Sequence, residues 1–384
     1  IGAEIKLDWV APSDTNGDDV DGYMIERSET SASAGFTTIV ADTASTAVTY
    51  TDGVTNTLTT GVTYYYKISA INIYGTSDAS NVDSTIASDV PAQVTNTVAT
   101  EQVGAEIGLT WSVPSNGGSA ITGYLIERST TSAVAGFTDL VADTGSTTAS
   151  YTDGVSNNLV IGTEYWYRIS AINIVGSGTA STADSTVAGD RPAQISVISA
   201  TAQAGQEILV AWTAPADNSY AISSYLIQVS TDQQNWTTAG SSTTTSFTDT
   251  SLGVGVTYYY RAHATNSLGD SDKSGIVNAL AGDVPAQTTG LTTTVLSDTQ
   301  IRLNWTAPVD NAYSISGYKI EQSTDNVTFT VAVADTASTA VVHTISSLTP
   351  KTDYYFKISA INALGTGTAS TAVIGTTWDV PDVI

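Results

Sequence analysis

The stretch Thr63-Tyr64-Tyr65-Tyr66-Lys67-Ile68-Ser69-Ala70-Ile71-Asn72 decides the fold of this chain. Its residues alternate between two faces: one carries Tyr64, Tyr66, Ile68 and Ala70, and the other carries Tyr65, Lys67 and Ser69. A period of two with apolar residues on one face is typical of a β-strand that lies on a hydrophobic core. Related stretches begin at Tyr165, Tyr258 and Tyr354, and each copy ends in Asn-x-x-Gly. The chain therefore repeats one structural unit.

Two further elements precede each of these stretches. The first is Trp-x-x-Pro and the second is Tyr-x-Ile, at Trp9/Pro12, Trp111/Pro114, Trp212/Pro215 and Trp305/Pro308, and at Tyr23/Ile25, Tyr124/Ile126, Tyr225/Ile227 and Tyr318/Ile320. Consecutive Trp residues lie about 100 residues apart, which is the size of one small domain. Apolar residues alternate before each Trp, and the 3.6-residue period of a helix persists nowhere. Short alternating strands in repeats of this size predict antiparallel β-sandwiches.

The combined pattern Ile-x-Leu-x-Trp-x-x-Pro, Gly-Tyr-x-Ile-Glu and Tyr-x-Tyr-Lys/Arg-Ile-x-Ala-x-Asn-x-x-Gly resembles the fibronectin type III signature. Copies such as that around Tyr124 are similar to the module in bacterial and archaeal surface proteins. The resemblance implies an all-β fold of tandem antiparallel, immunoglobulin-like β-sandwiches, four in a row as an elongated rod. It places the Trp on strand B, Tyr-x-Ile on strand C and the Tyr-rich stretch on strand F. The interval from Leu58 to Tyr64, shared by all copies, fits a tyrosine corner, in which the Tyr hydroxyl bonds the backbone upstream of strand F.

Proline-containing segments mark the boundaries between repeats, at residues 89–93, 190–194 and 283–287. They predict four repeats: repeat 1 over 1–88, repeat 2 over 89–189, repeat 3 over 190–282 and repeat 4 over 283–378, with 379–384 as the start of a further repeat or a linker. Repeat 1 is expected to lack strand A, because its first residues already have the pattern of strand B. Two alternatives follow: the chain is a window of a longer array, or a neighbouring subunit donates the strand.

The charge balance excludes some partners. The chain has 12 Lys+Arg against 37 Asp+Glu, a net charge of −25. Such a chain is repelled by nucleic acid and by anionic lipid, so we expect no nucleic-acid partner. No run of about 20 apolar residues is present, so we expect no membrane insertion. Cysteine is absent, which excludes disulfides, zinc–thiolate sites and Cys nucleophiles. Together with the resemblance to surface-protein repeats, this leads us to expect an extracellular or cell-surface location.

The sequence offers few groups for catalysis. Its two His residues, His263 and His343, fall in different repeats and each replaces an ordinary repeat residue. His263 stands at an outward position of strand F that is Ser69 in repeat 1, and His343 stands where strand E of repeat 1 has Tyr50. Nucleophile-elbow, phosphate-loop and zinc-protease motifs are missing. We therefore expect no catalytic residues and no enzyme.

One loop of repeat 1 suggests a cation. Asp14, Asn16, Asp18 and Asp21 place oxygen atoms at intervals around a Gly, as in calcium-binding loops of the Asp-x-Asn-x-Asp type. The twelfth position is Ile25, which excludes an EF-hand loop. Two interpretations remain: a solvated acidic turn, or a calcium site with these four residues as ligands. Calcium is the one cofactor that the sequence suggests.

Two surface features are candidates for contact or modification. Outward aromatic residues recur on strand F at Tyr65, Trp166, Tyr259 and Tyr355. They either offer a lateral contact for sugars or a protein, or cover cross-strand neighbours and the stems of Arg and Lys. Three Asn-x-Thr triplets make Asn235, Asn304 and Asn326 candidates for glycosylation.

These observations favour a non-catalytic structural or adhesive segment of a microbial surface protein: a stalk, surface layer or filament. The expected partner is a protein, through self-association or neighbouring surface subunits, or a cell-surface glycan. The alternatives are accessory spacer or carbohydrate-contacting repeats of a secreted polysaccharide-degrading enzyme, and a viral tail or capsid decoration.

Overall fold

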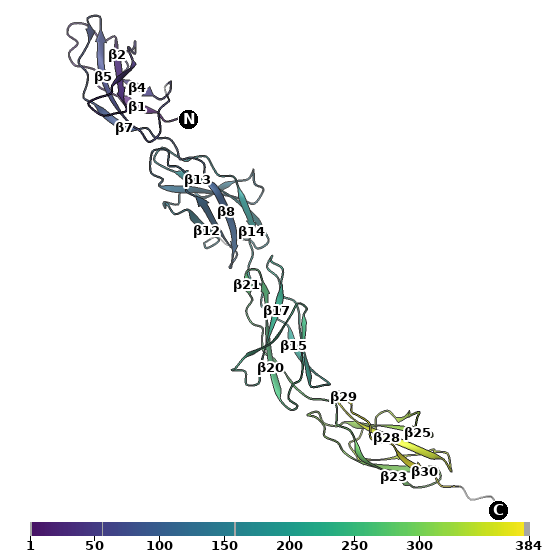
Figure 1. Ribbon diagram of the computed structural model, residues 1–384. Coiled ribbons are helices and arrows are strands. Elements are labelled where there is room, and N and C mark those ends of the chain that lie inside the picture. The colour runs from purple at the N-terminus through teal and green to yellow at the C-terminus, as the bar shows by residue number, and fades with distance from the viewer. Residues whose placement is uncertain (1, 56, 157–158, 380–384) are drawn as a thin grey trace, which may run out of the picture. The chain divides into compact units, whose positions relative to one another are not determined.

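The computed structural model describes residues 2–55, 57–156 and 159–379, which form β-strands, turns and loops (Figure 1). The predicted further repeat at 379–384 lies, from residue 380 on, outside the described residues. The chain divides into two compact units, 1–190 and 191–384. Across the described residues, no helix has the length and apolar character that crossing a membrane requires.

The first unit contains repeats 1 and 2. The strands of repeat 1 are β1 (Ile5–Asp8), β2 (Gly22–Ser28), β3 (Thr37–Val40), β4 (Thr49–Asp52), β5 (Thr63–Asn72), β6 (Gly75–Thr76) and β7 (Asp83–Ile86). Those of repeat 2 are β8 (Thr95–Gln102), β9 (Glu106–Ser112), β10 (Gly123–Ser129), β11 (Thr138–Val141), β12 (Ser150–Asp153), β13 (Glu164–Ile172) and β14 (Asp184–Val187). Repeat 2 has the sheets β12-β9-β8 and β11-β10-β13-β14. Repeat 1 pairs β1 with β4, and its other sheet runs β3-β2-β5-β6 with β7 also against β5.

The second unit contains repeats 3 and 4. The strands of repeat 3 are β15 (Ile198–Gln203), β16 (Glu207–Trp212), β17 (Ser224–Ser230), β18 (Thr237–Ser242), β19 (Ser246–Asp249), β20 (Thr257–Asn266), β21 (Gly269–Asp270) and β22 (Val277–Leu280). Those of repeat 4 are β23 (Thr289–Val295), β24 (Ile301–Thr306), β25 (Gly317–Ser323), β26 (Thr330–Val333), β27 (Val342–Ile345), β28 (Asp353–Asn362), β29 (Gly365–Thr366) and β30 (Val373–Thr376). Both repeats have one sheet of strands A, B and E, namely β15-β16-β19 and β23-β24-β27. The other sheets are β18-β17-β20-β21, with β22 against β20, and β26-β25-β28-β29, with β30 against β28.

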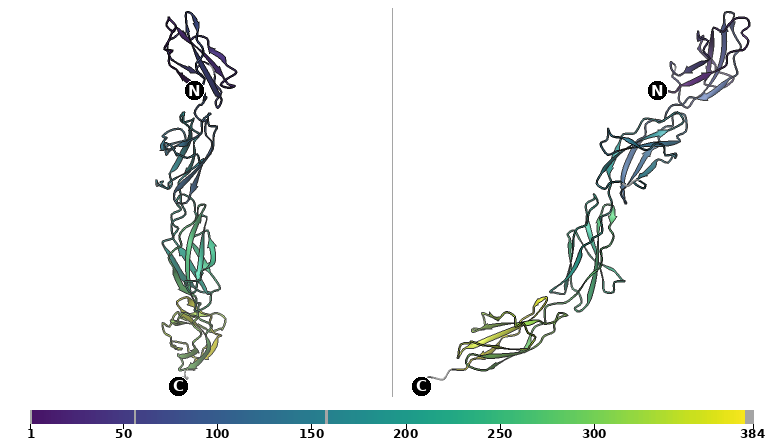
Figure 2. Two further views of the ribbon diagram at one scale, coloured as in Figure 1. Left: turned by 90° about the vertical axis from the view of Figure 1, so that its left-hand side faces the viewer. Right: turned by 180° about the vertical axis from the view of Figure 1, so that it is seen from behind.

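Each repeat has its own hydrophobic core between its two sheets. Figure 2 shows the strands of the four repeats in two further views. The predicted inward residues form these cores. In repeat 2 the rings of Trp111 and Tyr124 meet edge to face with centroids 4.9 Å apart, an arrangement that aromatic quadrupoles favour. The same Trp–Tyr contact recurs in the other repeats, with centroids 4.9–5.1 Å apart, at Trp9/Tyr23, Trp212/Tyr225 and Trp305/Tyr318.

The predicted tyrosine corner is confirmed in every repeat. The Tyr165 hydroxyl accepts a hydrogen bond from the backbone N–H of Val160 at 3.0 Å. The bond holds the connection from strand E against the start of strand F. The same bond joins Thr59 N to Tyr64, Gly253 N to Tyr258 and Thr349 N to Tyr354, at 2.9–3.0 Å.

Candidate binding surface

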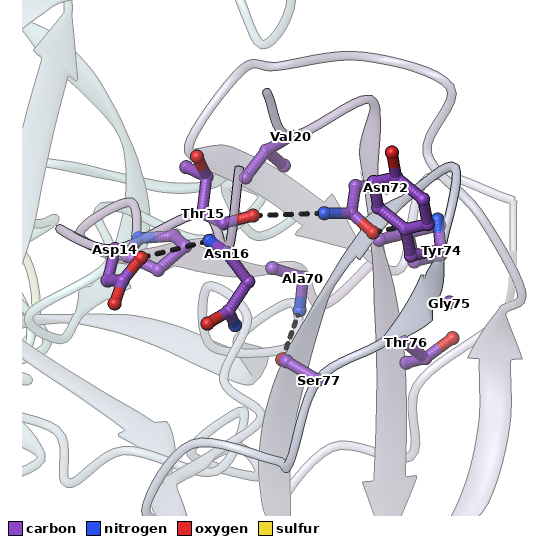
Figure 3. A pocket seen from close by; sticks show the side chains of 12 residues that line it. Asp14, Thr15, Asn16, Val20, Ala70, Asn72, Tyr74, Gly75, Thr76 and Ser77 are labelled. Carbon is purple, nitrogen blue, oxygen red and sulfur yellow. Dashed lines mark hydrogen bonds between the residues drawn. The ribbon is translucent and has the colours of Figure 1, made fainter. Parts of the chain in front are cut away.

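A hollow of about 270 Å³ lies in repeat 1, between the B–C loop, the end of β5 and the following turn (Figure 3). Asn72 is one of the residues that line it. The Asn72 Nδ2 donates to the carbonyl oxygen of Thr15 at 3.1 Å, and its Oδ1 accepts from the N–H of Tyr74 at 3.0 Å. The Ser77 Oγ accepts from the N–H of Ala70 at 2.9 Å on the opposite wall. The hollow is therefore lined by amide, hydroxyl and carbonyl groups that bond to one another, together with apolar side chains such as Val20 and Ile71.

The predicted calcium ligands lie beside this hollow. Asp14 Oδ1 accepts from the N–H of Asn16 at 2.9 Å, and Asn16 has a φ of 52°. The equivalent turn in the other repeats has the same bond, from Gly118 to Asn116, from Ser219 to Asp217 and from Ala312 to Asp310. Asp14 thus has a structural role in a turn that every repeat contains.

The three acidic residues of the loop, Asp14, Asp18 and Asp21, are not grouped into a metal site in the described part of the chain. Asp18 and Asp21 donate their backbone N–H groups to Thr15 O and Ile71 O. Within ranges 2–55, 57–156 and 159–379, no three His, Cys, Asp or Glu side chains are grouped so that they could hold a metal. The structure lends no support to calcium at this loop, and calcium binding stays a prediction.

A second hollow of about 540 Å³ lies next to the first, between β1, β5 and β7. Leu7, Trp9 and Ile68 contribute its apolar wall. These three side chains are half-buried, whereas their counterparts in repeat 2 are buried, namely Leu109, Trp111 and Ile169. Among the described residues β1 pairs with β4 alone, as expected for a repeat without strand A, whereas this apolar wall was not predicted from the sequence.

The predicted lateral-contact residues Tyr65, Trp166, Tyr259 and Tyr355 are half-buried on strand F of the four repeats. Each faces a Ser of strand C across the sheet, as Tyr65 faces Ser28. This pairing agrees with the interpretation that they cover cross-strand neighbours. Lateral contact stays a prediction for them.

A regular cation–aromatic pair, which sequence reasoning missed, lies beside these residues. The Arg168 Cζ lies 4.4 Å from the ring centre of Phe137, and its guanidinium donates to both carboxylate oxygens of Glu127 at 2.6 and 2.7 Å. The pair recurs as Lys67/Phe36, Arg261/Trp236 and Lys357/Phe329. The signal was an aromatic residue at one fixed position before strand C′ in every repeat. Such pairs hold the C–C′ loop against strand F.

The three glycosylation candidates differ in accessibility. Asn326 is exposed in a turn, where its φ is 58°. Asn235 is also exposed, but its Nδ2 donates to Asp232 Oδ2 at 2.7 Å. Asn304 is half-buried on β24. Glycosylation stays a prediction, and of the three candidates Asn235 and Asn326 are the exposed ones.

The two His residues do not form a site. His263 is only 7% exposed, and its Nε2 lies 3.4 Å from Asp270 Oδ2. The same position of strand F is buried in the other repeats as well, where it is Ser69, Ser170 and Ser359. At this position of strand F, a side chain on the outward face is therefore buried and not exposed to solvent. His343 is half-buried on β27, opposite Leu303, at the strand E position that was predicted.

The most perturbed ionisable cluster belongs to the core. Asp52 is fully buried and accepts hydrogen bonds from Arg27 Nη1 and the Tyr66 hydroxyl, both at 2.9 Å. Burial raises the pKa of Tyr66, and its bond to Asp52 acts in the same direction. Repeat 2 has the same cluster in Arg128, Asp153 and Tyr167, whereas repeat 4 has Gln322, Ile345 and Phe356 at these positions. Since repeat 4 has an uncharged version of this cluster, the cluster supports folding rather than chemistry.

The comparison with known families agrees with this architecture. The family model of the fibronectin type III domain matches residues 92–187, 191–279 and 285–376. Among curated relatives, the cell adhesion molecule DSCAM of Rattus norvegicus is 32% identical over 190 residues, covering 45% of this chain and 9% of the relative. Myomesin-2 of Homo sapiens is 24% identical, covering 95% of this chain and 26% of the relative.

A bacterial relative is Exoglucanase B of Cellulomonas fimi, which is 24% identical over 79% of this chain and 27% of the relative. The chain thus spans less than a third of the length of each of these three relatives. The matches of the family model cover more than half of the chain and coincide with complete sandwiches of the structure. The chain therefore belongs to the fibronectin type III domain family.

Proposed function

We propose that the chain is a non-catalytic structural or adhesive segment of a microbial extracellular surface protein, such as a stalk, a surface layer or a filament. The observation that best supports this proposal is that the same type of β-sandwich, with the same core contact, occurs in all four repeats. All four repeats have the same Trp–Tyr contact. Repetition of a complete folded module supports a role as a spacer or a scaffold.

The distribution of reactive groups supports the same proposal. Catalysis needs side chains that converge on a substrate with suitable pKa values. The cluster around Asp52 instead binds its members to one another inside a core. His263 and His343 belong to different repeats and occupy positions of ordinary repeat residues.

The relatives and the charge indicate the class of partner. One relative is named as a cell adhesion molecule and another is a myomesin, and both share these repeats. A net charge of −25 disfavours nucleic acid and anionic lipid. We propose a protein partner, through self-association or neighbouring surface subunits, or a cell-surface glycan.

Antibodies against the chain test the location. On intact, unpermeabilised cells of its source, we expect them to label the surface, and brief protease treatment of intact cells should remove the signal. Label that appears only after permeabilisation would contradict the proposal.

A second candidate function has the match to Exoglucanase B in its favour. In that case the chain is an accessory part of a secreted polysaccharide-degrading enzyme. Sedimentation with insoluble cellulose, chitin or xylan distinguishes the two. A surface scaffold stays in the supernatant, whereas a carbohydrate-contacting accessory sediments with its polysaccharide and loses binding when Trp166 is replaced by Ala.

A further inference from the structure

A very short segment joins repeats 3 and 4, which belong to one compact unit of the structure. β22 of repeat 3 ends at Leu280. The backbone N–H of Asp283 already donates to the carbonyl oxygen of Asn311, in the B–C loop of repeat 4, at 3.1 Å. The Asn362 Nδ2, at the end of strand F, donates to Asp283 O at 2.8 Å. Repeat 4 therefore holds the chain almost directly after the last strand of repeat 3.

Repeat 3 holds the same segment from the other side. Gly205 and Gln206 lie in its A–B turn, between β15 and β16. The N–H of Gln206 donates to Gly282 O at 3.1 Å, and the N–H of Gly205 donates to Asp283 Oδ1 at 2.8 Å. Asp283 therefore bonds to both repeats, and the segment is part of two folded repeats rather than a flexible linker.

One side chain reaches from repeat 4 back to repeat 3. Tyr313 lies in the B–C loop of repeat 4, and its hydroxyl donates to the carbonyl oxygen of Leu280 at 2.9 Å. Leu280 is the last residue of β22 in repeat 3. The Tyr313 side chain is half-buried although it belongs to a loop. Its hydrogen bond therefore ties a loop of repeat 4 to the final strand of repeat 3.

Gly282 provides the space for this ring. A Cβ placed on Gly282 would lie 2.6 Å from Tyr313 Cδ2 and 2.7 Å from Asn311 O, which is closer than side chains pack. Gly282 is buried, and its backbone is outside the left-handed region, so no turn requires a Gly at this position. The Gly is therefore needed for the close approach of the Tyr313 ring. We call this the Tyr313–Gly282 contact.

The boundary between repeats 1 and 2, which also lies within one compact unit, has small polar residues at both positions. Ser88 stands at the position of Gly282, and Ser119 stands at the position of Tyr313. The Ser119 Oγ donates to Ser88 Oγ at 2.9 Å. One boundary thus has a large ring opposite a Gly, and the other has two hydroxyls. The paired difference indicates that the residues at the two positions depend on each other.

We propose that the Tyr313–Gly282 contact fixes the orientation of repeat 4 on repeat 3, so that the two repeats move as one rigid body. Adjacent domains of one chain move relative to each other unless their interface is well packed. Here a ring packs closely on a buried backbone, and its hydroxyl is held by Leu280 O, so repeat 4 can turn only if this contact opens. This conformational property goes beyond the proposed spacer or adhesive role and is independent of which partner the chain binds.

A pair of spin labels on the full chain tests the proposal. The chain contains no cysteine, so two introduced Cys residues are its only thiols. Thr248→Cys and Thr344→Cys place the labels at exposed, equivalent positions of strand E in repeats 3 and 4. Double electron–electron resonance should give one narrow distribution of the distance between the labels. A distribution that is already broad in this labelled parent would overturn the proposal.

Matched variants in the labelled chain locate the cause of the rigidity. Tyr313→Ser, which copies Ser119, should lose the narrow distribution, whereas Ser314→Ala, a change at the exposed neighbouring residue, should keep it. Gly282→Ser should also broaden the distribution, because the added Cβ displaces the Tyr313 ring. The double variant of Gly282 and Tyr313, both to Ser, should be no broader than Tyr313→Ser alone, because the two changes remove one contact.

Amide exchange of the same variants separates a loosened contact from an unfolded repeat. Exchange in β25 and β28 should match the parent, whereas the N–H of Asp283 should exchange about tenfold faster in Tyr313→Ser. A distribution that stays narrow in Tyr313→Ser or in Gly282→Ser, or that broadens equally in Ser314→Ala, would show that the Tyr313–Gly282 contact does not fix the two repeats.

Discussion

Arg27 Nη1 donates a hydrogen bond to Asp52 Oδ2 at 2.9 Å, and the Asp52 carboxylate is fully buried in repeat 1. The four repeats form a natural series around this pair. Repeat 2 keeps both residues, and repeat 3 keeps Asp249 but has Val229 in place of the Arg. Repeat 4 has Gln322 and Ile345. Asp249 without its Arg is half-buried and accepts a hydrogen bond from the Tyr260 hydroxyl. The fold therefore accepts a fully buried carboxylate with Arg, a more exposed carboxylate without Arg, or an apolar residue, and all three avoid an uncompensated, fully buried charge.

Removal of Arg27, the partner of Asp52, should lower the free energy of unfolding of repeat 1. We expect Arg27→Ala to destabilise repeat 1 by about 3–5 kcal/mol, because it leaves a buried carboxylate without its cation. The triple variant Arg27→Gln, Asp52→Ile, Tyr66→Phe, which copies repeat 4, should remain within about 1 kcal/mol of the parent. Amide exchange of β4 and β5 in the full chain measures the effect, with exposed Arg302→Ala as the control. Equal destabilisation by the single and the triple variant would contradict this explanation.

Alkaline pH should lower the stability of the repeats in which a buried Tyr hydroxyl bonds to an Asp carboxylate. Burial raises the pKa of Tyr66, Tyr167 and Tyr260 above the ordinary value of about 10. Their stabilising contribution is complete below pH 10 and is lost as pH rises further, because the unfolded state releases its protons first. The loss is at most about 1.4 kcal/mol per pH unit for each Tyr. Calorimetry between pH 9 and 11 should show a smaller decline for Tyr66→Phe than for the parent, and an equal decline would exclude the linkage.

The tyrosine corner should contribute through one hydrogen bond. Tyr165→Phe leaves the N–H of Val160 without its hydroxyl acceptor, and we expect a loss of about 1–2 kcal/mol in the unfolding of repeat 2. Tyr259→Phe removes the hydroxyl of a half-buried outward Tyr and should cost less. Urea unfolding of both full-chain variants provides the comparison. The corner has no measurable role if the two midpoints shift equally.

Asp325 should remain ionised into strong acid. A hydrogen bond from the Ser323 hydroxyl, joined by those from the N–H groups of Thr328 and Val327, lowers the pKa of Asp325 to about 2. Above pH 4 the ionised Asp325 carboxylate therefore stabilises the turn fully, and this stabilisation is lost as the pH falls towards 2. Carboxyl NMR titration should give this low pKa in the parent and a higher pKa in Ser323→Ala. An unchanged pKa in that variant would show that the hydroxyl is not the main cause.

Sequence periodicity was sufficient to predict the structural features that lie within one strand or one short connection. The alternation around Tyr66 and the interval between Leu58 and Tyr64 follow from local geometry, so strand F and its corner could be predicted. The Arg27–Asp52 pair could not, because its members lie on different sheets and alternation does not show which charged residue turns inward. His263 was expected on the outward face of strand F, but alternation did not show that this position is buried in every repeat.

The candidate site was predicted only in part. The open edge of β1 and the acidic loop near Asp14 were recognised from the repeat pattern. Asn72 was identified only as part of a motif, because its bond to the carbonyl oxygen of Thr15 joins the end of strand F to the B–C loop, which lies far away in the sequence.

Amide hydrogen exchange of the full chain carrying Trp111→Ala tests most directly whether each repeat folds around its own core. The Trp111 side chain is buried in the core of repeat 2 and contacts Tyr124. We expect its loss to destabilise repeat 2 by about 3–5 kcal/mol and to speed exchange in β9, β10 and β13, while exchange in β24, β25 and β28 of repeat 4 stays unchanged. Equal loss of protection in repeats 2 and 4, or unchanged exchange in repeat 2, would contradict four sandwiches with separate cores.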